Sequence, residues 1–364
     1  MMMLQRHLSR TRLLLGSLAL LVFLTSHCNL LTNQACAQDT VQVYILAGQS
    51  NMEGKAKNSL FDHQASAPET KEFFAHLRDG EKWLEMDDVF INYLNRNGHL
   101  TLGYGSRDRT GIEYEFGYRM GKQHKDPVLL IKTCWGGHSL YKKFRSPSNP
   151  VPDSVLKQDL EQQVKNVQRN NEKKDRNDPA PTADEVRQQY GDSYRMMVDE
   201  VTNTLKELDT RFPELAGKKT NIAGFVWFQG WNDQYNGAET EYDHNLRMLV
   251  DDIRKEWKKP KLPVVIAVMG QNMSQEAKGA MKVIQDAQIG VAESDEYKDS
   301  VRAVRTAVLV DKAAEELYPN WRQNFEKWEK TGSDFAYHYM GSAIWMTRIG
   351  GHCADAMIEL VGKD

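Results

Sequence analysis

The chain has 364 residues, a formal net charge of −3 and four cysteines. This length suits one α/β domain with insertions, and a mildly acidic chain is a poor candidate for binding the phosphate backbone of a nucleic acid. Four cysteines in so long a chain also exclude a disulfide-stabilised scaffold.

The first 37 residues are expected to form a signal peptide for export. Three arginines precede the apolar run Leu13–Leu24, and Ala35-Cys36-Ala37 offers a small-residue cleavage site before Gln38. A retained membrane anchor is the alternative, but the run is shorter than the ~20 apolar residues that span a bilayer. Removing three arginines and no acid takes the net charge from −3 to −6. No second long apolar run follows, so no membrane association is expected after cleavage.

The two cysteines beyond the signal are Cys134 and Cys353. They could pair with each other, or both could remain buried free thiols. The sequence leaves both alternatives open.

Five short apolar segments predict buried β-strands. They are Val41–Ala47, Val128–Thr133, Ile222–Phe228, Val264–Met269 and Val301–Val310. Segments with helical periodicity alternate with them, most clearly Glu113–Gln123, Ser193–Leu208, Glu241–Trp257, Gln275–Ala292 and Gly341–Val361. Such alternation predicts a central parallel sheet of about five strands, covered by helices on both faces. Ligands on such sheets bind at the carboxyl ends of the strands.

Two segments interrupt this pattern. Residues 146–191 are polar and charged, and we interpret them as a surface insertion with one solvated helix. A charge-rich run of this kind is more simply explained as a solvated surface than as a segment that covers the substrate. Residues 57–110 form a long connection with little regular pattern, and long connections in compact domains are often functional. The expected organisation is therefore a signal over 1–37 and one domain over 38–364.

A candidate nucleophile follows the first strand, in Gly48-Gln49-Ser50-Asn51-Met52. An isolated Gly-x-Ser segment more often caps a helix than carries chemistry. At the carboxyl end of a first parallel strand, however, a serine lies where ligands bind, and amides at a helix start stabilise nearby negative charge. The interpretation as a nucleophile depends on the other strand ends.

Those strand ends carry the groups that a serine nucleophile needs. Gly136 and Gly137 follow the second strand and allow backbone amides to approach an oxyanion, while Gln229 ends the third strand with an amide that can donate to one. His338 is the natural general base for Ser50, with Asp334 close enough to orient its ring. Taken alone, the Gly136-Gly137 pair is more simply an ordinary turn, and His338 is more simply a surface or packing residue.

The same segments resemble a known family. The nucleophile block resembles that of the SGNH-hydrolase superfamily, and more narrowly that of the sialate O-acetylesterase and acetylxylan esterase group, carbohydrate esterase family 6. Four further blocks resemble that group in chain order, at Gly111-Ile112-Glu113, Lys132–Leu140, Trp227–Gly230 and Asp334–His338. The matching blocks extend over nearly the whole mature chain.

The resemblance implies a three-layer α/β/α sandwich of the flavodoxin-like SGNH type, with no metal and no organic cofactor. It implies Ser50 as nucleophile, His338 as base and Asp334 as the acid. It implies that the oxyanion donors are the Ser50 amide, an amide of Gly136 or Gly137, and the Gln229 side chain. Residues expected to bind substrate or support the site are Gln49, Asn51, Glu113, His138 and Trp231, with Glu113 more a support for the nucleophile loop than a catalytic group.

Two departures from the family pattern bear on these assignments. Three residues separate Asp334 from His338, where the superfamily usually has two, so Asp311 is a second candidate for the acid. Trp231 stands where family members often carry glutamate after the Gln-Gly pair, and an aromatic ring there suits stacking on a sugar or another apolar face.

We therefore expect a secreted or periplasmic serine esterase that removes O-acetyl groups from carbohydrate, with acetylated xylan or sialate as substrate type. Two alternatives remain open. One is a carbohydrate-binding protein that keeps the fold without the chemistry, and the other is an esterase for a non-carbohydrate ester. The sequence does not specify the sugar or the oligomeric state.

Overall fold

The computed structural model describes residues 40–362 of the chain. The expected signal peptide lies outside the described residues. Within them, the main feature is a seven-stranded sheet in the order β11-β10-β9-β1-β8-β5-β6. Its strands are β1 (Thr40–Gly48), β5 (Val89–Tyr93), β6 (Arg96–His99), β8 (Val128–Cys134), β9 (Lys219–Phe228), β10 (Val264–Val268) and β11 (Val301–Arg305).

The five predicted strands are all present, although the fifth ends at Arg305 rather than Val310, and they pair in parallel in the order β11-β10-β9-β1-β8. Two further strands, β5 and β6, lie within the connection over residues 57–110 in which no regular pattern was expected. β5 continues the parallel sheet beside β8, and β6 pairs antiparallel with β5 as the edge strand. The sheet is therefore larger than the expected five strands, and its fold class is confirmed.

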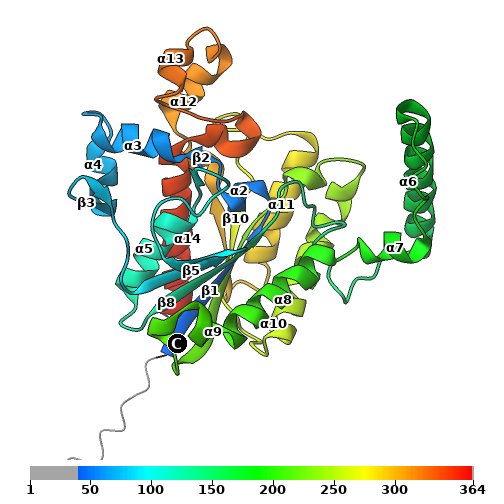
Figure 1. The fold of residues 1–364 in the computed structure, drawn as a ribbon, viewed down its shortest axis with the longest axis horizontal. Helices are drawn as coiled ribbons and strands as arrows, with labels where there is room; N and C mark the ends of the chain where they lie inside the picture. Colours follow the sequence, from blue (N-terminus) through cyan, green and yellow to red (C-terminus); the bar gives the residue numbers. More distant parts are fainter. Residues whose placement is uncertain (1–39, 363–364) are drawn as a thin grey trace, which may run out of the picture. The chain divides into compact units, whose positions relative to one another are not determined.

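Helices cover both faces of the sheet (Figure 1). On one face lie α5 (Glu113–Gln123) and α14 (Ala343–Val361), and on the other lie α8 (Asp192–Lys206), α10 (Tyr242–Glu256) and α11 (Gly279–Glu293). Alternate residues of β1 feed the two apolar cores, because successive strand side chains point to opposite faces: Tyr44 and Leu46 belong to one core and Val43 and Ile45 to the other. This is the predicted three-layer α/β/α sandwich.

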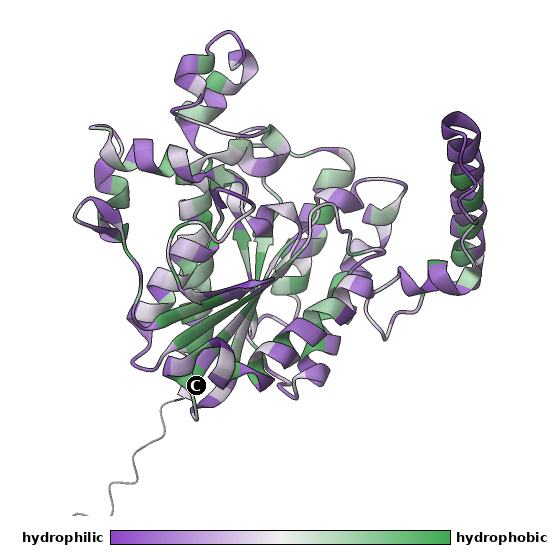
Figure 2. Ribbon diagram, in the orientation of Figure 1, coloured by the Kyte–Doolittle hydropathy of each residue, from purple (hydrophilic) through white to green (hydrophobic). Residues whose placement is uncertain are grey.

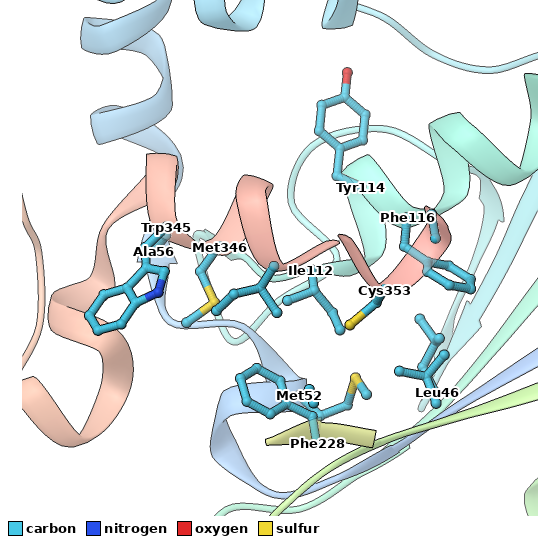
Figure 3. Close-up of a cluster of buried hydrophobic side chains, with 14 of the residues drawn as sticks. Leu46, Met52, Ala56, Ile112, Tyr114, Phe116, Phe228, Trp345, Met346 and Cys353 are labelled. Carbon is cyan, nitrogen blue, oxygen red and sulfur yellow. The ribbon is translucent and has the colours of Figure 1, made fainter. Parts of the chain in front are cut away.

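The core on the α5 and α14 side extends up to the loop after β1. Figure 3 shows its side chains, which come from β1, β9, α2 (Ser50–Glu53), α5 and α14. Met52 of α2 and Phe228 at the end of β9 are both buried there, as is Trp345 of α14. The segment that carries the candidate nucleophile is therefore packed directly onto the core.

Shorter strands and helices lie outside the seven-stranded sheet. They are β2 (Ala56–Lys57) paired with β7 (Arg109–Thr110), β3 (Arg78–Asp79) paired with β4 (Lys82–Trp83), and the helices α3 (Asn58–Ser66), α4 (Lys71–Phe74), α9 (Leu208–Arg211), α12 (Lys312–Leu317) and α13 (Phe325–Trp328). The segment Ala336–Gly341, η7, is a short 3₁₀ stretch that contains His338.

The charged segment over residues 146–191 contains two helices, α6 (Asp153–Lys174) and α7 (Ala183–Gln188). Figure 1 shows α6 standing apart from the sheet, and Figure 2 shows that it is hydrophilic along most of its length. Leu156 is its one buried residue and packs in a small apolar cluster with Val151, Val186 and Tyr190. No helix among residues 40–362 combines the length and apolar character needed to cross a bilayer.

Candidate active site

The loops that carry the predicted site residues leave the sheet at one level. Gly48, the last residue of β1, pairs with Cys134 of β8 on one side and with Phe228 of β9 on the other. The three strands are parallel, so the segments after them begin together at the carboxyl edge of the sheet, where ligands bind in such folds. A side chain on Gly48 would collide with the Phe228 carbonyl oxygen, which explains the glycine before the serine.

Ser50 begins the short helix α2 and keeps only 7% of its surface exposed. Its Oγ lies 3.0 Å from Nε2 of His338, although the two residues are 288 positions apart in the sequence. Nδ1 of His338 lies 3.1 Å from Oδ1 of Asp334. The structure therefore brings the predicted serine, histidine and acid into one hydrogen-bonded chain, the arrangement that activates a serine nucleophile.

The unusual spacing between Asp334 and His338 is accommodated by the backbone after the histidine. Tyr339, Met340 and Gly341 all have left-handed φ values of 54° to 57°. The turn folds back so that the Met340 carbonyl oxygen accepts hydrogen bonds from the amides of Ser333 and Asp334. This closed turn holds the acid against the imidazole despite the extra residue.

Asp311, the second candidate for the acid, has other partners. Its Oδ2 accepts a 2.6 Å hydrogen bond from Ser342 Oγ, and its Oδ1 accepts one from the Ala314 amide at the start of α12. Asp311 is 4% exposed and is a helix cap tied to the start of α14. Of the two candidates, the structure places Asp334 beside His338.

Arg109 fixes the other oxygen of Asp334. Its Nη1 lies 2.5 Å from Oδ2 of Asp334 and also donates to the Lys55 carbonyl oxygen at 2.6 Å. Burial acts to raise the pKa of Asp334, but hydrogen bonds from His338 and the Phe335 amide, with the charge of Arg109, outweigh it and lower the pKa. Asp334 is therefore a carboxylate at neutral pH and can hold an imidazolium.

Gln229, expected to donate to an oxyanion, has its donors directed inward. Its Nε2 lies 2.6 Å from Oδ2 of Asp233, 3.1 Å from the His138 carbonyl oxygen and 3.2 Å from Oε1 of Gln49. The side chain is 2% exposed. As placed, Gln229 joins the three strand-end loops, and an oxyanion would have to displace one of these acceptors.

Asp233 is the centre of this buried network. Its two oxygens accept hydrogen bonds from the amides of Leu140 and Tyr141, at 2.9 and 2.7 Å, in addition to the bond from Gln229. Burial raises its pKa to about 6. Gln49 extends the network, because its Nε2 donates to Asn232 Oδ1 at 3.1 Å. The residue before the serine is thus tied to the loop after β9.

The two glycines after β8 differ in their surroundings. The Gly136 amide donates a hydrogen bond to the Glu53 carboxylate. Burial acts to raise the pKa of Glu53, but hydrogen bonds from Lys55, Ser106 and this amide outweigh it and lower the pKa. Gly137 has φ +77°, and a Cβ there would lie 3.9 Å from the side-chain nitrogen Nδ2 of Asn232. Gly137 is therefore the better candidate for a free backbone donor.

Glu113, expected to support the nucleophile loop, is fully buried and contacts the segments next to that loop. Its Oε1 accepts the Gly111 amide at 2.8 Å, and its Oε2 lies 2.8 Å from Lys132 Nζ, with both side chains fully buried. Lys132 also donates to the carbonyl oxygens of Glu53 and Tyr104, each at 2.8 Å. This buried pair joins the end of α2 to the sheet.

The remaining predicted residues lie around this centre. Asn51 donates to the Tyr337 carbonyl oxygen at 3.2 Å and so ties α2 to the histidine loop. His138 Nδ1 lies 2.7 Å from Ser193 Oγ, and burial, with the nearby charge of Lys143, lowers its pKa. Trp231 packs against Tyr337, with ring centroids 5.9 Å apart.

Both cysteines of the domain, Cys134 and Cys353, are free and buried. Burial raises the pKa of both thiols, to about 12 for Cys134, so neither is a ready nucleophile. Among the described residues, no group of three or more His, Cys, Asp or Glu side chains is arranged to hold a metal ion.

Sequence reasoning missed four residues that position the site: Arg109, Asp233, Lys132 and Glu53. Lys132 had a usable signal, since a lysine inside an otherwise apolar strand needs a buried anionic partner. Asp233 had no such signal, because nothing local shows that its carboxylate accepts hydrogen bonds from amides 92 and 93 positions away.

Comparison with known proteins assigns the chain to a family. Residues 40–174 and 181–315 match the family of carbohydrate esterases described as sialic acid-specific acetylesterases. The match covers more than half of the chain, so the chain belongs to this family and the resemblance seen in the sequence motifs is confirmed. Membership supports an esterase function. Among curated proteins, no sequence matches the chain.

Solved structures also align with the chain. A protein from Arabidopsis thaliana has 13% identity and a TM-score of 0.49, covering 88% of this chain and 98% of its own. A carbohydrate acetylesterase from Xanthomonas citri has 12% identity and a TM-score of 0.46, covering 89% of this chain, which spans 57% of that protein. NanS has 12% identity and a TM-score of 0.42, covering 74% of this chain and 78% of its own.

Proposed function

We propose that this protein is a serine esterase that removes O-acetyl groups from carbohydrate through an acyl-enzyme. The observation that carries the proposal is the hydrogen-bonded chain Ser50–His338–Asp334, with contacts of 3.0 and 3.1 Å, in a member of a carbohydrate esterase family. Its position at the carboxyl edge of a parallel sheet agrees with where such folds bind ligands.

In the first half-reaction, Ser50 Oγ attacks the acetyl carbonyl carbon while its proton passes to Nε2 of His338. Asp334 holds the ring by Nδ1 and stabilises the imidazolium. The tetrahedral intermediate collapses as His338 returns the proton to the sugar oxygen, which leaves as a free hydroxyl. Ser50 then carries the acetyl group as an ester.

In the second half-reaction, His338 takes a proton from water, and the resulting hydroxide equivalent attacks the acetyl-serine. Collapse of this second intermediate returns a proton to Ser50 Oγ and releases acetate. The same base therefore serves both steps, so its loss should slow both formation and hydrolysis of the acyl-enzyme.

The oxyanion of both intermediates needs donors fixed before the reaction. We assign this role to the Ser50 amide, which as the first helical amide has no acceptor within α2, and to the Gly137 amide. The Gly136 amide is engaged by Glu53, and the Gln229 side chain by Asp233 and Gln49. Gln229 then acts by positioning the loops that carry the donors.

We also propose that residues 1–37 direct export and are removed before Gln38. Amino-terminal sequencing of the protein recovered from the periplasm or the medium tests this. A mature chain that starts at Gln38 supports the proposal, and a chain that retains Leu13–Leu24 contradicts it.

The direct test of the function is acetate release from a panel of acetylated xylan, O-acetylated sialic acid and a lipid ester, by the wild type and by Ser50→Ala. We expect release from at least one carbohydrate, with turnover reduced by about 10⁴-fold or more in the variant. Activity on the lipid ester alone would contradict the carbohydrate assignment, and normal turnover by Ser50→Ala would contradict the mechanism. Circular dichroism of the variant confirms that the fold is intact.

A further inference from the structure

Five aromatic side chains, which we call the aromatic strip, follow one another away from His338. They are Trp231, Tyr337, Phe335, Trp321 and Phe325. Consecutive ring centroids lie 5.9, 5.4, 6.4 and 6.4 Å apart in that order. The strip therefore connects the loop after β9 with the histidine loop and with α13.

The strip exposes large apolar side chains that folding normally buries. Phe325 is 54% exposed, Phe335 43% and Tyr337 38%, which makes them three of the eight large hydrophobic side chains exposed among the described residues. Exposed apolar side chains that gather in one place, with polar groups around them, mark binding surfaces in soluble proteins. Tyr337 and Phe335 are in direct ring contact, and Phe325 joins them through Trp321, so the strip presents one continuous candidate binding surface.

The position of the strip relative to the candidate triad narrows the choice of ligand. The Tyr337 ring lies 4.4 Å from the His338 ring, centroid to centroid, and Trp231 lies directly after the Gln229-Gly230 pair. A molecule that lies on the strip at this end is in reach of Ser50, whose Oγ is 3.0 Å from His338 Nε2. The strip is thus continuous with the proposed reaction centre.

At its far end, the strip borders a hollow of about 480 Å³, a size typical of small-molecule sites. Its apolar wall includes Trp321, Phe325 and Phe335, while Lys57, Arg109 and other polar groups supply hydrogen-bond donors and acceptors. The buried Trp328 also lines the hollow and packs against Trp321, with ring centroids 6.0 Å apart. The hollow combines flat apolar surface with polar groups.

This combination fits a sugar better than a purely apolar ligand. A pyranose ring has a face of C–H groups that packs on an aromatic ring and a rim of hydroxyls that needs hydrogen-bond partners. A strip that continues beyond the reach of one sugar ring suits several rings in sequence. A membrane surface would leave the ammonium group of Lys57 without water or hydrogen-bond partners.

We propose that the aromatic strip and the adjoining hollow bind a carbohydrate chain of several sugar units, with the acetylated unit at the Trp231–Tyr337 end beside Ser50. This proposal rests on the proposed function and specifies its substrate class as an oligomeric or polymeric glycan rather than a single sugar. Residues of α13 and the histidine loop would then set specificity without taking part in the bond changes.

The test compares two substrates, an acetylated xylo-oligosaccharide of about six units and 4-nitrophenyl acetate, in wild type, Phe335→Ala and Phe325→Ala. The readout is the ratio of kcat/KM for the oligosaccharide to kcat/KM for the small ester. We expect each variant to lower this ratio about tenfold, mainly through KM. Both side chains are largely exposed, so the variants should fold, and their melting temperatures check this.

Tyr118→Ala is the matched control, because Tyr118 is a half-buried aromatic residue on α5 that lines a separate hollow with His76. It should leave the ratio unchanged. Binding of unacetylated xylohexaose to Ser50→Ala, measured by calorimetry, gives a second readout that needs no turnover. We expect the affinity to fall about tenfold when Phe335→Ala is added.

The outcomes separate this proposal from the function on which it rests. If the wild type releases acetate from carbohydrate but the strip variants leave both the ratio and the binding unchanged, the strip proposal is wrong and the function stands. If the wild type releases no acetate from any glycan, the function is wrong, and loss of xylohexaose binding in Phe335→Ala would still support the strip. Binding to phosphatidylcholine vesicles that Phe335→Ala abolishes would contradict a glycan ligand.

Discussion

Ser50 follows a strand that is buried from residue 43 to residue 48, whereas His338 lies in a partly exposed segment between α13 and α14. The serine is positioned by sheet pairing on both sides of Gly48 and by the buried Lys132–Glu113 pair. The histidine is positioned by a turn of left-handed residues and by two contacts to Asp334 and Ser50.

This difference predicts which property, stability or turnover, should decrease when each half of the site is disrupted. The support of the serine is shared with the core, so disrupting it should reduce the free energy of unfolding. The support of the histidine is local and partly exposed, so disrupting it should reduce turnover while the fold remains. Four predictions test this contrast, from the largest expected effect to the smallest.

Asp334→Asn should reduce kcat about 10⁴-fold, because the asparagine neither favours the required ring tautomer nor stabilises the imidazolium. Asp311→Asn is the matched control. It should lower the melting temperature, because the nitrogen that replaces Oδ2 cannot accept the hydrogen bond from Ser342, while Oδ1 can still cap α12; kcat should change less than tenfold. Steady-state kinetics on 4-nitrophenyl acetate measure both. A larger loss of turnover in Asp311→Asn would reverse the assignment of the acid.

Lys132→Met should reduce the free energy of unfolding by ~3–5 kcal/mol, because it leaves the fully buried Glu113 carboxylate without its partner. The double variant Lys132→Met with Glu113→Gln should recover part of this loss, since no buried charge remains. Urea denaturation measures both. A loss below 1 kcal/mol in the single variant would show that the serine loop does not depend on the core in this way.

Asp233 should make stability depend on pH in the opposite direction to a salt-bridged acid. Burial raises its pKa to about 6 from the ordinary 3.8, so the folded protein holds this proton more tightly than the unfolded chain. Its contribution to the free energy of unfolding is therefore greatest below pH 4 and decreases as the pH rises to about 6, by ~3 kcal/mol for a shift of this size.

The difference in unfolding free energy between the wild type and Asp233→Asn isolates this contribution. We expect the wild type to lose stability relative to the variant between pH 4 and pH 6.5 in urea titrations. A difference that stays constant over this range would mean that the Asp233 carboxylate is not buried as described.

Arg109→Gln should lower kcat/KM about tenfold, because Oδ2 of Asp334 loses its fixed partner and the carboxylate gains freedom to turn away from His338. Arg109→Lys should recover part of the loss. A positioning role predicts an effect on kcat greater than on KM, together with an unchanged melting temperature. A tenfold increase in KM with kcat unchanged would instead place Arg109 in substrate binding.

The sequence indicated the candidate triad better than the residues that hold it in place. Ser50 and His338 could be found because each follows or precedes a recognisable element in a short motif. Arg109 could not be found, because its partner Asp334 lies 225 positions away in the sequence. Arg109 also belongs to the two-residue strand β7, which pairs with the equally short β2. Contacts of this range depend on packing that no local pattern records.

The fold was predicted in the same uneven way. The five apolar strands were visible because each contains a run of apolar residues, fully buried in β8 and β10. β5 was not, because it has five residues with a polar Asn92 in the fourth position, whose side chain hydrogen-bonds to Glu200 and Arg211. The role of Gln229 shows the same limit, because its type and position suggested a free donor while buried acceptors from two other loops occupy it.

Mass spectrometry of the enzyme, quenched with acid during turnover of 4-nitrophenyl acetate, detects the proposed acyl-enzyme itself. We expect an added acetyl group on the peptide that contains Ser50, absent from Ser50→Ala and formed more slowly in His338→Ala. Acetyl transfer to another residue in the active wild type, or turnover by Ser50→Ala at the wild-type rate, would contradict this mechanism.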